Sequence, residues 1–402
     1  MAEQHASRWV ALDVLRGLAV AGMILVTSPG AWDKGYWPLL HADWDGWTLA
    51  DMIFPTFLFA VGMALALSFP KPLSDPADRK RFWVRVIRRV LALIALGVFL
   101  NALGEFKDAL WLHDEGAGTL GHVRLPGVLQ RIALCYLLGI VLIVATARRD
   151  AEGRSTINAP AIGIAIVAGL TLYWALLKFV PVPGVGAGHL DIPGNLVGYV
   201  DRAVFGAKHM WRLGSEFWAG PVYYDPEGLL STITATTNLL FGVLAARVWQ
   251  QNPDGAVVRI AGLGAVLLIV GLALDPVFPI NKRIWTSSFA LMSSGFSALT
   301  LVATMVALRS SLVERLSLPL RILGTNAILA FAVSILAGQF GNLPIVGPPD
   351  SKIATLQQWG NQVALGIFGD PYLASYACAL AILTLITLAI WPLYRKGIHL
   401  RL

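Results

Sequence analysis

Apolar runs of about 20 residues recur along the whole 402-residue chain, and they limit the possible folds more than any other feature. A bilayer core requires about 20 apolar residues for each helix that crosses it. Charged residues make up 14% of the chain, against about 25% in soluble domains. A transmembrane barrel would instead show short segments of alternating polarity. The sequence therefore predicts an all-α polytopic membrane protein.

Ten segments have the length and composition of transmembrane helices. Their predicted ranges are 10–28, 48–69, 85–104, 125–146, 157–179, 229–249, 257–275, 285–308, 320–341 and 372–394. We expect a bundle of about ten transmembrane helices in a single domain, residues 1–402. The amphipathic segment 353–369 predicts a re-entrant or surface helix.

The distribution of lysine and arginine predicts the orientation of the chain, because these residues are enriched in cytoplasmic loops. With the N-terminus inside, nineteen of the 31 basic residues lie on the cytosolic side and ten on the outer side. We therefore predict that both termini are cytosolic and that a long extracytoplasmic loop covers about 180–228. The bias also accounts for the net charge of +7 without a nucleic-acid partner.

The long loop is rich in glycine, proline and aromatic residues. Its aromatic residues are Trp211, Phe217, Trp218, Tyr223 and Tyr224. Such side chains either stack on sugar rings and cap a cavity or form an interfacial belt. The two cysteines, Cys135 and Cys378, each lie in an apolar run and indicate neither a disulfide framework nor a metal site.

A cluster of ionisable and aromatic residues, from His41 to Asp51, directly precedes the second apolar segment. Polar groups at the edge of a bilayer are costly unless they are solvated, paired or functional. Histidine is the side chain best suited to transfer a proton near neutral pH. Thr48 and Asp51 fit a helix-capping pattern. Asp51 therefore either caps this helix or orients His41, as an acid orients a catalytic imidazole.

Polar residues also lie in the first and fourth predicted spans, where they need partners. Asp13 and Arg16 share a helix face, so they either neutralise each other or form a cationic entrance for an anionic ligand. Gln130 and Arg131 either bond to neighbouring helices or line a site.

Two segments on the predicted outer side add further candidates. Asn281 and Lys282 precede a helix start, which suits an anion or a developing oxyanion, although simple capping with Trp285 as an interfacial anchor fits as well. Glu227 lies near another helix start, where the dipole favours an acid.

Five segments together resemble the heparan-α-glucosaminide N-acetyltransferase family, in order and over nearly the whole chain. They are Arg8–Gly17, His41–Phe57, Arg124–Ile132, Asp225–Ser231 and Pro279–Thr286. The likeness is greatest to bacterial members that lack the large lumenal domain, including one associated with N-acetylglucosamine utilisation.

The resemblance implies a transmembrane acetyltransferase in the bacterial inner (cytoplasmic) membrane. Acetyl-CoA would bind from the cytosol as donor substrate, without a metal, and the acetyl group would pass to an amino sugar or glycan on the other side by N- or O-acetylation. The family's catalytic histidine corresponds to His41 and its motif-ending aspartate to Asp51. The resemblance also favours a homodimer in contact with membrane lipid.

We assign the remaining candidates to the two substrates. Those for the acceptor are Trp44, Glu227, Asn281, Lys282 and Trp285. Those for acetyl-CoA are Asp13, Arg16, Arg124, Gln130 and Arg131. The inner cluster of Arg85, Arg88 and Arg89 would attract the CoA phosphates.

The chain departs from the family where an asparagine often follows the first span, because Thr27 stands there. We expect Thr27, Ser28 or Asn281 to supply the oxyanion donor instead. Direct transfer in a ternary complex and a route through acetyl-histidine both fit the motif.

Two other functions fit a polytopic fold: a transporter for an amino sugar or a related sugar, and a scaffold without catalysis. Release of the CoA thiol with an acceptor distinguishes the enzyme from both.

Overall fold

The computed structural model describes residues 2–69, 76–111, 120–149, 155–216, 220–347 and 353–399. The long helices are α1 (Ala2–Thr27), α2 (Leu49–Leu67), α3 (Pro76–Trp111), α4 (Val128–Thr146), α5 (Ala159–Phe179), α7 (Thr232–Gln251), α8 (Pro253–Ala273), α9 (Ser287–Ala307) and α14 (Pro371–Arg395). The shorter helices are α6 (Leu196–Phe205), α10 (Ser311–Leu316), α11 (Leu318–Thr325), α12 (Ala327–Gly341) and α13 (Leu356–Phe368). Short 3-10 turns are η1 (Trp37–Leu39), η2 (Leu120–His122) and η3 (Ala207–His209).

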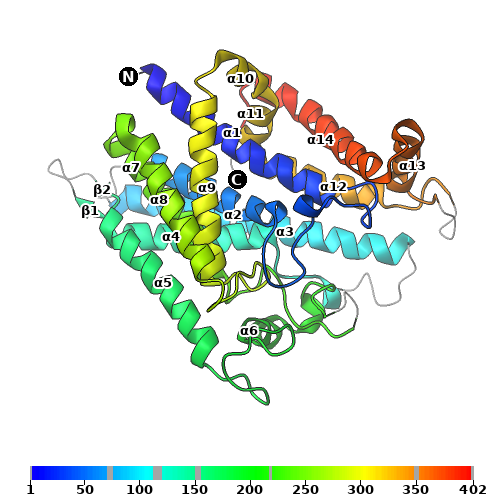
Figure 1. Cartoon of the computed structure of the whole chain (residues 1–402), viewed down its shortest axis with the longest axis horizontal. Coiled ribbons are helices and arrows are strands. Elements are labelled where there is room, and N and C mark those ends of the chain that lie inside the picture. Colours follow the sequence, from blue (N-terminus) through cyan, green and yellow to red (C-terminus); the bar gives the residue numbers. More distant parts are fainter. Residues whose placement is uncertain are drawn as a thin grey trace.

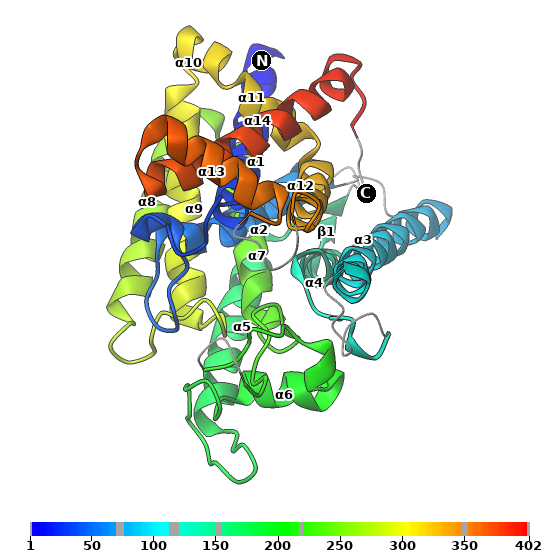
Figure 2. The same cartoon turned by 90° about the vertical axis from the view of Figure 1, so that its right-hand side faces the viewer.

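A small hairpin accompanies the helices. Strands β1 (Arg148–Arg149) and β2 (Ser155–Thr156) pair antiparallel, with Arg148 opposite Thr156. In Figure 1 the N-terminus lies at the upper left and this hairpin at the left edge, whereas α6 lies toward the bottom. Figure 2 likewise separates the N-terminus from α6. The segment that joins α5 to α7 therefore lies far from the N-terminus.

Each of the ten predicted transmembrane segments contains helix, which confirms the all-α polytopic fold. Within the described ranges, eight helices are long and apolar enough to cross a membrane, or nine if α11 and α12 form one bent span. The remaining segment is α7, whose sequence includes four threonines and Asn238. These polar side chains are tolerated because α7 packs against α2, α4, α5, α8 and α9.

The predicted span 320–341 is not one straight helix. The axes of α11 and α12 differ by 91°, and the break falls at Asn326, whose ψ of 43° is not helical. The buried Asn326 amide donates to the Ile398 carbonyl over 3.3 Å, which fixes the C-terminal segment at the bend.

Close contact between α2 and α7 forms the centre of the bundle. Gly62 of α2 faces the Leu239 carbonyl, and a Cβ at Gly62 would lie 1.8 Å from that oxygen. Gly242 of α7 faces the Phe59 carbonyl, where a Cβ would lie 1.9 Å away. The two backbones can therefore approach this closely only because both positions lack a side chain. This contact fixes α2, the helix that carries Asp51.

Candidate functional site

The first turn of α2 brings His41 and Asp51 together. Oδ2 of Asp51 accepts from the backbone nitrogens of Thr48, at 3.0 Å, and Ala42, at 3.1 Å. Oδ1 of the same carboxylate lies 2.8 Å from Nδ1 of His41. Asp51 is fully buried, whereas one-third of the His41 side chain is exposed. The two roles considered for Asp51 are therefore compatible, because a different oxygen serves each.

Lys282 comes from the segment before α9 and completes this cluster. Its Nζ lies 3.2 Å from Oδ1 of Asp51, 2.9 Å from Nδ1 of His41 and 3.4 Å from Nε2. Burial and the adjacent ammonium of Lys282 lower the pKa of His41 to about 4, against the opposing effect of Asp51. Burial also lowers the pKa of Lys282. At neutral pH the imidazole is therefore uncharged and able to accept a proton.

Asn281 joins the His41 segment to the segment before α9. Its Nδ2 donates to Oδ1 of Asp45 over 3.1 Å, and its Oδ1 accepts from the Ile284 nitrogen at 3.0 Å. The Gly46 nitrogen adds a bond to the Ile280 carbonyl at 2.7 Å. Asn281 thus holds Lys282 beside His41, and its side-chain amide is engaged in this contact.

Trp285 and Arg131 support the cluster from inside the bundle. Trp285 is 1% exposed, its indole nitrogen donates to Oδ1 of Asn238 over 2.9 Å, and its φ of 52° is the only positive value of a described non-glycine residue. The Arg131 guanidinium lies 5.1 Å from the centre of its ring. Arg131 also donates to the Gly228 carbonyl at 2.8 Å and to Ser231. Neither residue faces solvent.

The Arg124 side chain forms an ion-pair network with two acids. It donates to both carboxylate oxygens of Asp225, at 2.9 and 2.6 Å, and to Glu227. Burial opposes the charged form, but the two acids hold the pKa of Arg124 well above its usual value. Asp225 also accepts from the Trp211 nitrogen at 2.8 Å. Sequence patterns did not distinguish Asp225, the buried centre of this network, from its neighbours.

Aromatic residues of the long loop surround the same region. The Trp44 ring meets the Tyr224 ring edge-on, 5.0 Å between centroids, and its indole nitrogen donates to the Leu190 carbonyl at 2.9 Å. The Arg283 guanidinium lies over the Trp211 ring, 5.4 Å from the ring centre. Phe217 and Trp218 lie outside the described residues. The loop is thus attached to the His41 segment through Trp44.

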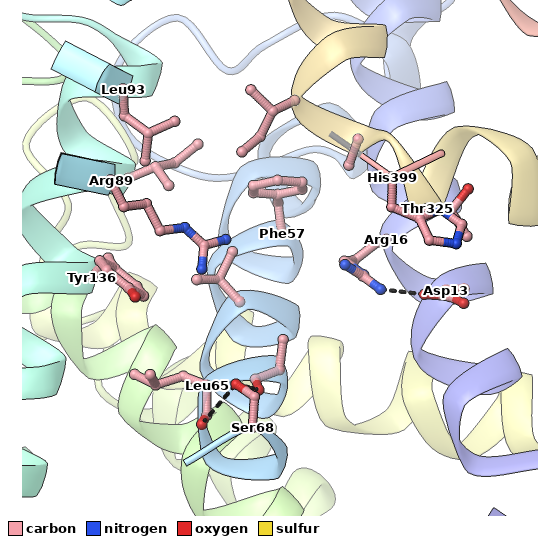
Figure 3. A pocket seen from close by; sticks show the side chains of 15 residues that line it. Asp13, Arg16, Phe57, Leu65, Ser68, Arg89, Leu93, Tyr136, Thr325 and His399 are labelled. Atoms are coloured by element: carbon pink, nitrogen blue, oxygen red, sulfur yellow. Dashed lines mark hydrogen bonds and ion pairs between the residues drawn. The ribbon is translucent and has the colours of Figure 1, made fainter. Parts of the chain in front are cut away.

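A separate cavity of about 390 Å³ lies along the other half of α2. It is lined by Asp13, Arg16, Phe57, Val61, Ala64, Leu65, Ser68, Arg89, Leu93, Ile132, Tyr136, Thr325, Ala327, Ile328 and His399. Figure 3 shows Arg16, Arg89 and His399 around this space. On α2 the lining begins at Phe57, six residues after Asp51, or about 9 Å along the helix axis. The cavity and the His41 cluster therefore share one helix.

Cations dominate the charge of this cavity. Arg16 pairs with Asp13, while its Nε has no hydrogen-bond partner among the described residues. The Arg89 guanidinium lies 4.9 Å from the Tyr136 ring centre. Of the predicted donor-side residues, the structure brings Asp13 and Arg16 to the cavity together with Arg89, whereas Arg85 and Arg88 do not line it.

The other predicted donor-side residues lie elsewhere. Arg124 and Arg131 bind the segment before α7, and Gln130 donates to the Leu125 carbonyl at 3.0 Å. Sequence patterns missed His399 and Thr325, because neither belongs to a motif. Among the expected oxyanion donors, Thr27 uses its hydroxyl within α1, where it donates to the Met23 carbonyl.

Comparison with known proteins finds similar acetyltransferases. Residues 8–173 match the family model described as heparan-alpha-glucosaminide N-acetyltransferase, catalytic. The human protein named heparan-alpha-glucosaminide N-acetyltransferase is 28% identical over 322 residues, which cover 71% of this chain and 46% of that protein. The mouse protein of the same name is 26% identical over 326 residues, which cover 73% of this chain and 48% of that protein.

The chain is thus similar to heparan-alpha-glucosaminide N-acetyltransferases over most of its length. It spans about half the length of the two mammalian relatives. The region that matches the family model contains His41 and Asp51 but ends before Lys282. The contact between Lys282 and His41 is therefore a feature of this structure that the family model does not cover.

Proposed function

We propose that this chain is a transmembrane acetyltransferase that transfers the acetyl group of acetyl-CoA to an amino sugar on the opposite side of the membrane. The observation that carries the proposal is the organisation of α2. Its first turn holds the His41–Asp51 pair, and its other half lines a cationic cavity. One helix thus connects a proton acceptor to a space suited to an anionic donor.

The cavity has the properties that a CoA derivative requires. Its volume of about 390 Å³ falls within the usual range of ligand cavities, about 300–1,000 Å³. Arg16 and Arg89 offer positive charge for the phosphates. The N–H group at Nε of Arg16 has no hydrogen-bond acceptor among the described residues and can donate to a ligand. Phe57, Leu93 and Ile132 provide an apolar wall for the pantetheine arm.

His41 acts as the general base in this proposal. With Nδ1–H directed at Asp51, the lone pair of Nε2 takes a proton from the acceptor amine while the amine nitrogen attacks the thioester carbonyl. The carbon–sulfur bond then breaks, and the CoA thiolate receives the proton from the imidazolium. Asp51 stabilises that imidazolium as it forms. A low pKa of His41, about 4, keeps the base uncharged before the reaction.

Lys282 supplies a positive charge next to the reacting groups. Its Nζ lies 3.4 Å from Nε2 of His41, and we place the thioester carbonyl oxygen, which becomes negative during attack, next to this ammonium. A preorganised cation at such a position stabilises the transition state. We therefore assign Lys282 to the oxyanion in place of Thr27, whose hydroxyl is bonded within α1.

The acceptor would approach from the side of the long loop. Trp44 and Tyr224 form an aromatic wall there, and aromatic faces suit sugar rings. An amino sugar, free or within a glycan, is the acceptor class that fits both this wall and the family. We place the enzyme in the cytoplasmic membrane, with the cavity open to the cytosolic acetyl-CoA pool.

The test is thiol release from acetyl-CoA by the purified protein in nanodiscs, screened with glucosamine, N-acetylglucosamine and buffer alone. We expect thiol and acetylated sugar in equal amounts. Absence of thiol release with every acceptor, together with sugar uptake into proteoliposomes without acetyl-CoA, would establish the transporter instead. Sealed vesicles show from which side of the membrane the donor binds. Acetyl-CoA should support the reaction only when it is added on the side of the N-terminus.

A further inference from the structure

A second cavity, of about 150 Å³, lies where α3 begins and α4 ends. We call it the arginine pocket, and it is lined by Arg79, Phe82, Trp83, Val144, Ala147, Arg148, Arg149 and Ser155. None of these residues takes part in the His41 cluster or lines the larger cavity. The proposed reaction does not involve this pocket.

The arginine pocket concentrates positive charge. Among the described residues that line it, three are arginines and none is acidic. Within the part of the chain that the structure describes, Arg79, Arg148 and Arg149 form no ion pair, whereas the neighbouring Arg81 pairs with Asp78 at 3.6 Å. Three guanidiniums around a space of this size suit a phosphate group, which each can bind through two parallel hydrogen bonds.

The backbone around the pocket is held in place. Strands β1 and β2 pair Arg149 with Ser155, and the Thr156 hydroxyl donates to the Arg148 carbonyl at 3.2 Å. The rings of Phe82 and Trp83 meet edge-on, 5.6 Å between centroids. Arginines, a serine and two aromatic residues thus line the pocket from α3 and from the hairpin.

Exposed apolar side chains continue from the pocket along α3 and α4. Val84 is 58% exposed, Leu91 is 60% exposed and Val141 is 42% exposed. Trp83 lines the pocket and directly precedes Val84 in the chain, and tryptophan is enriched at membrane interfaces. A phosphate in the pocket would therefore have its attached acyl chains beside apolar surface. Basic pockets between transmembrane helices on the cytoplasmic side are suited to anionic lipid headgroups.

We propose that the arginine pocket binds the phosphate of an anionic phospholipid headgroup. The lipid would hold the β1–β2 hairpin against the start of α3. The phosphates of acetyl-CoA share the same chemistry, so the test must separate the two sources. Lipid retention and donor binding are therefore measured independently.

The experiment compares two triple variants in nanodiscs of phosphatidylcholine with or without phosphatidylglycerol. The pocket variant combines Arg79→Gln, Arg148→Gln and Arg149→Gln. The control combines Arg259→Gln, Arg309→Gln and Arg315→Gln, which removes the same charge from exposed arginines outside the pocket. Native mass spectrometry measures bound phosphatidylglycerol, and titration with acetyl-CoA measures donor affinity.

We expect the wild type and the control to retain phosphatidylglycerol. The pocket variant should bind phosphatidylglycerol about a hundredfold more weakly than the wild type, because each of its three arginines near a membrane surface adds about a factor of five in affinity. Donor affinity should stay unchanged. Equal lipid retention in all three proteins, or equal loss in both variants, would overturn the proposal. So would weaker acetyl-CoA binding with retained lipid, because the pocket would then serve the donor.

Single substitutions keep the test decisive if the pocket variant does not fold. Arg148→Gln and Arg149→Gln leave the backbone pairing of the hairpin intact. Each should lose about fivefold in phosphatidylglycerol affinity, with an unchanged melting temperature in phosphatidylcholine. No loss in either single variant contradicts the assignment.

Discussion

Oδ1 of Asp51 lies 2.8 Å from Nδ1 of His41, while the other oxygen of the same carboxylate accepts from the Thr48 nitrogen. The fold of the first turn of α2 and the orientation of the imidazole therefore depend on one buried side chain. A substitution at Asp51 affects stability and proton transfer together, and suitable variants can separate the two effects.

Asp51→Asn should lower turnover by about 10²–10⁴-fold with a small loss of stability. The amide can still accept from the backbone, but an amide nitrogen facing Nδ1 favours the wrong tautomer of His41. Turnover and the melting temperature are the two measurements. Thr48→Ala is the control, since it weakens the helix start and leaves the contact with His41 in place. Equal losses of turnover in both variants would mean that Asp51 acts only as a cap.

Lys282→Gln should move the acid limb of the pH–rate profile to higher pH. The ammonium of Lys282 helps to lower the pKa of His41 to about 4, so its removal raises that pKa. The base then becomes protonated, and activity falls, at a less acidic pH. The measurement is kcat/KM against pH, with the exposed Lys208→Gln as control. An unshifted acid limb in Lys282→Gln would separate Lys282 from the ionisation of His41.

Arg16→Gln should raise KM for acetyl-CoA by about tenfold or more, because a hydrogen bond to a charged group is worth about 1.5–3 kcal/mol. The effect on kcat should be smaller, since the cavity lies away from His41. Arg247→Gln is a matched control at an arginine that does not line the cavity. If both variants keep the wild-type KM, the cavity on α2 does not bind the donor.

Gly242→Ala should destabilise the protein by about 1–3 kcal/mol, the usual cost of overpacking. The added methyl would lie 1.9 Å from the Phe59 carbonyl, so α2 and α7 would have to separate. Gly262→Ala on α8 meets no atom within 4 Å and should unfold no earlier than the wild type. Melting temperatures in one detergent compare them. A stable Gly242→Ala protein would argue against the close helix contact.

Local patterns predicted the parts of the site that lie close together in sequence. The spacing of Thr48 and Asp51 indicated a helix start, and His41 lies only ten positions before Asp51. The same segment therefore predicted both the start of a helix and the candidate catalytic residues. Apolar runs predicted the helices in the same way, because each run is continuous.

Contacts between distant segments could not be predicted. Lys282 is 241 positions from His41, and residue types alone give no register between the segments that carry them. The break at Asn326 was missed because the apolar pattern continues across it. His399 lines the cavity, and a hydrogen bond from Asn326 to the adjacent Ile398 carbonyl attaches the C-terminal segment at that break.

The most direct test of the central claim compares His41→Ala with His189→Ala. His189 is also paired with an aspartate, Asp191 at 3.3 Å, but it is exposed in the long loop. Acetyl transfer to glucosamine and binding of acetyl-CoA are measured on both proteins. We predict that His41→Ala loses about 10²–10⁴-fold in turnover while binding acetyl-CoA normally, and that His189→Ala matches the wild type. Normal turnover in His41→Ala would contradict the account.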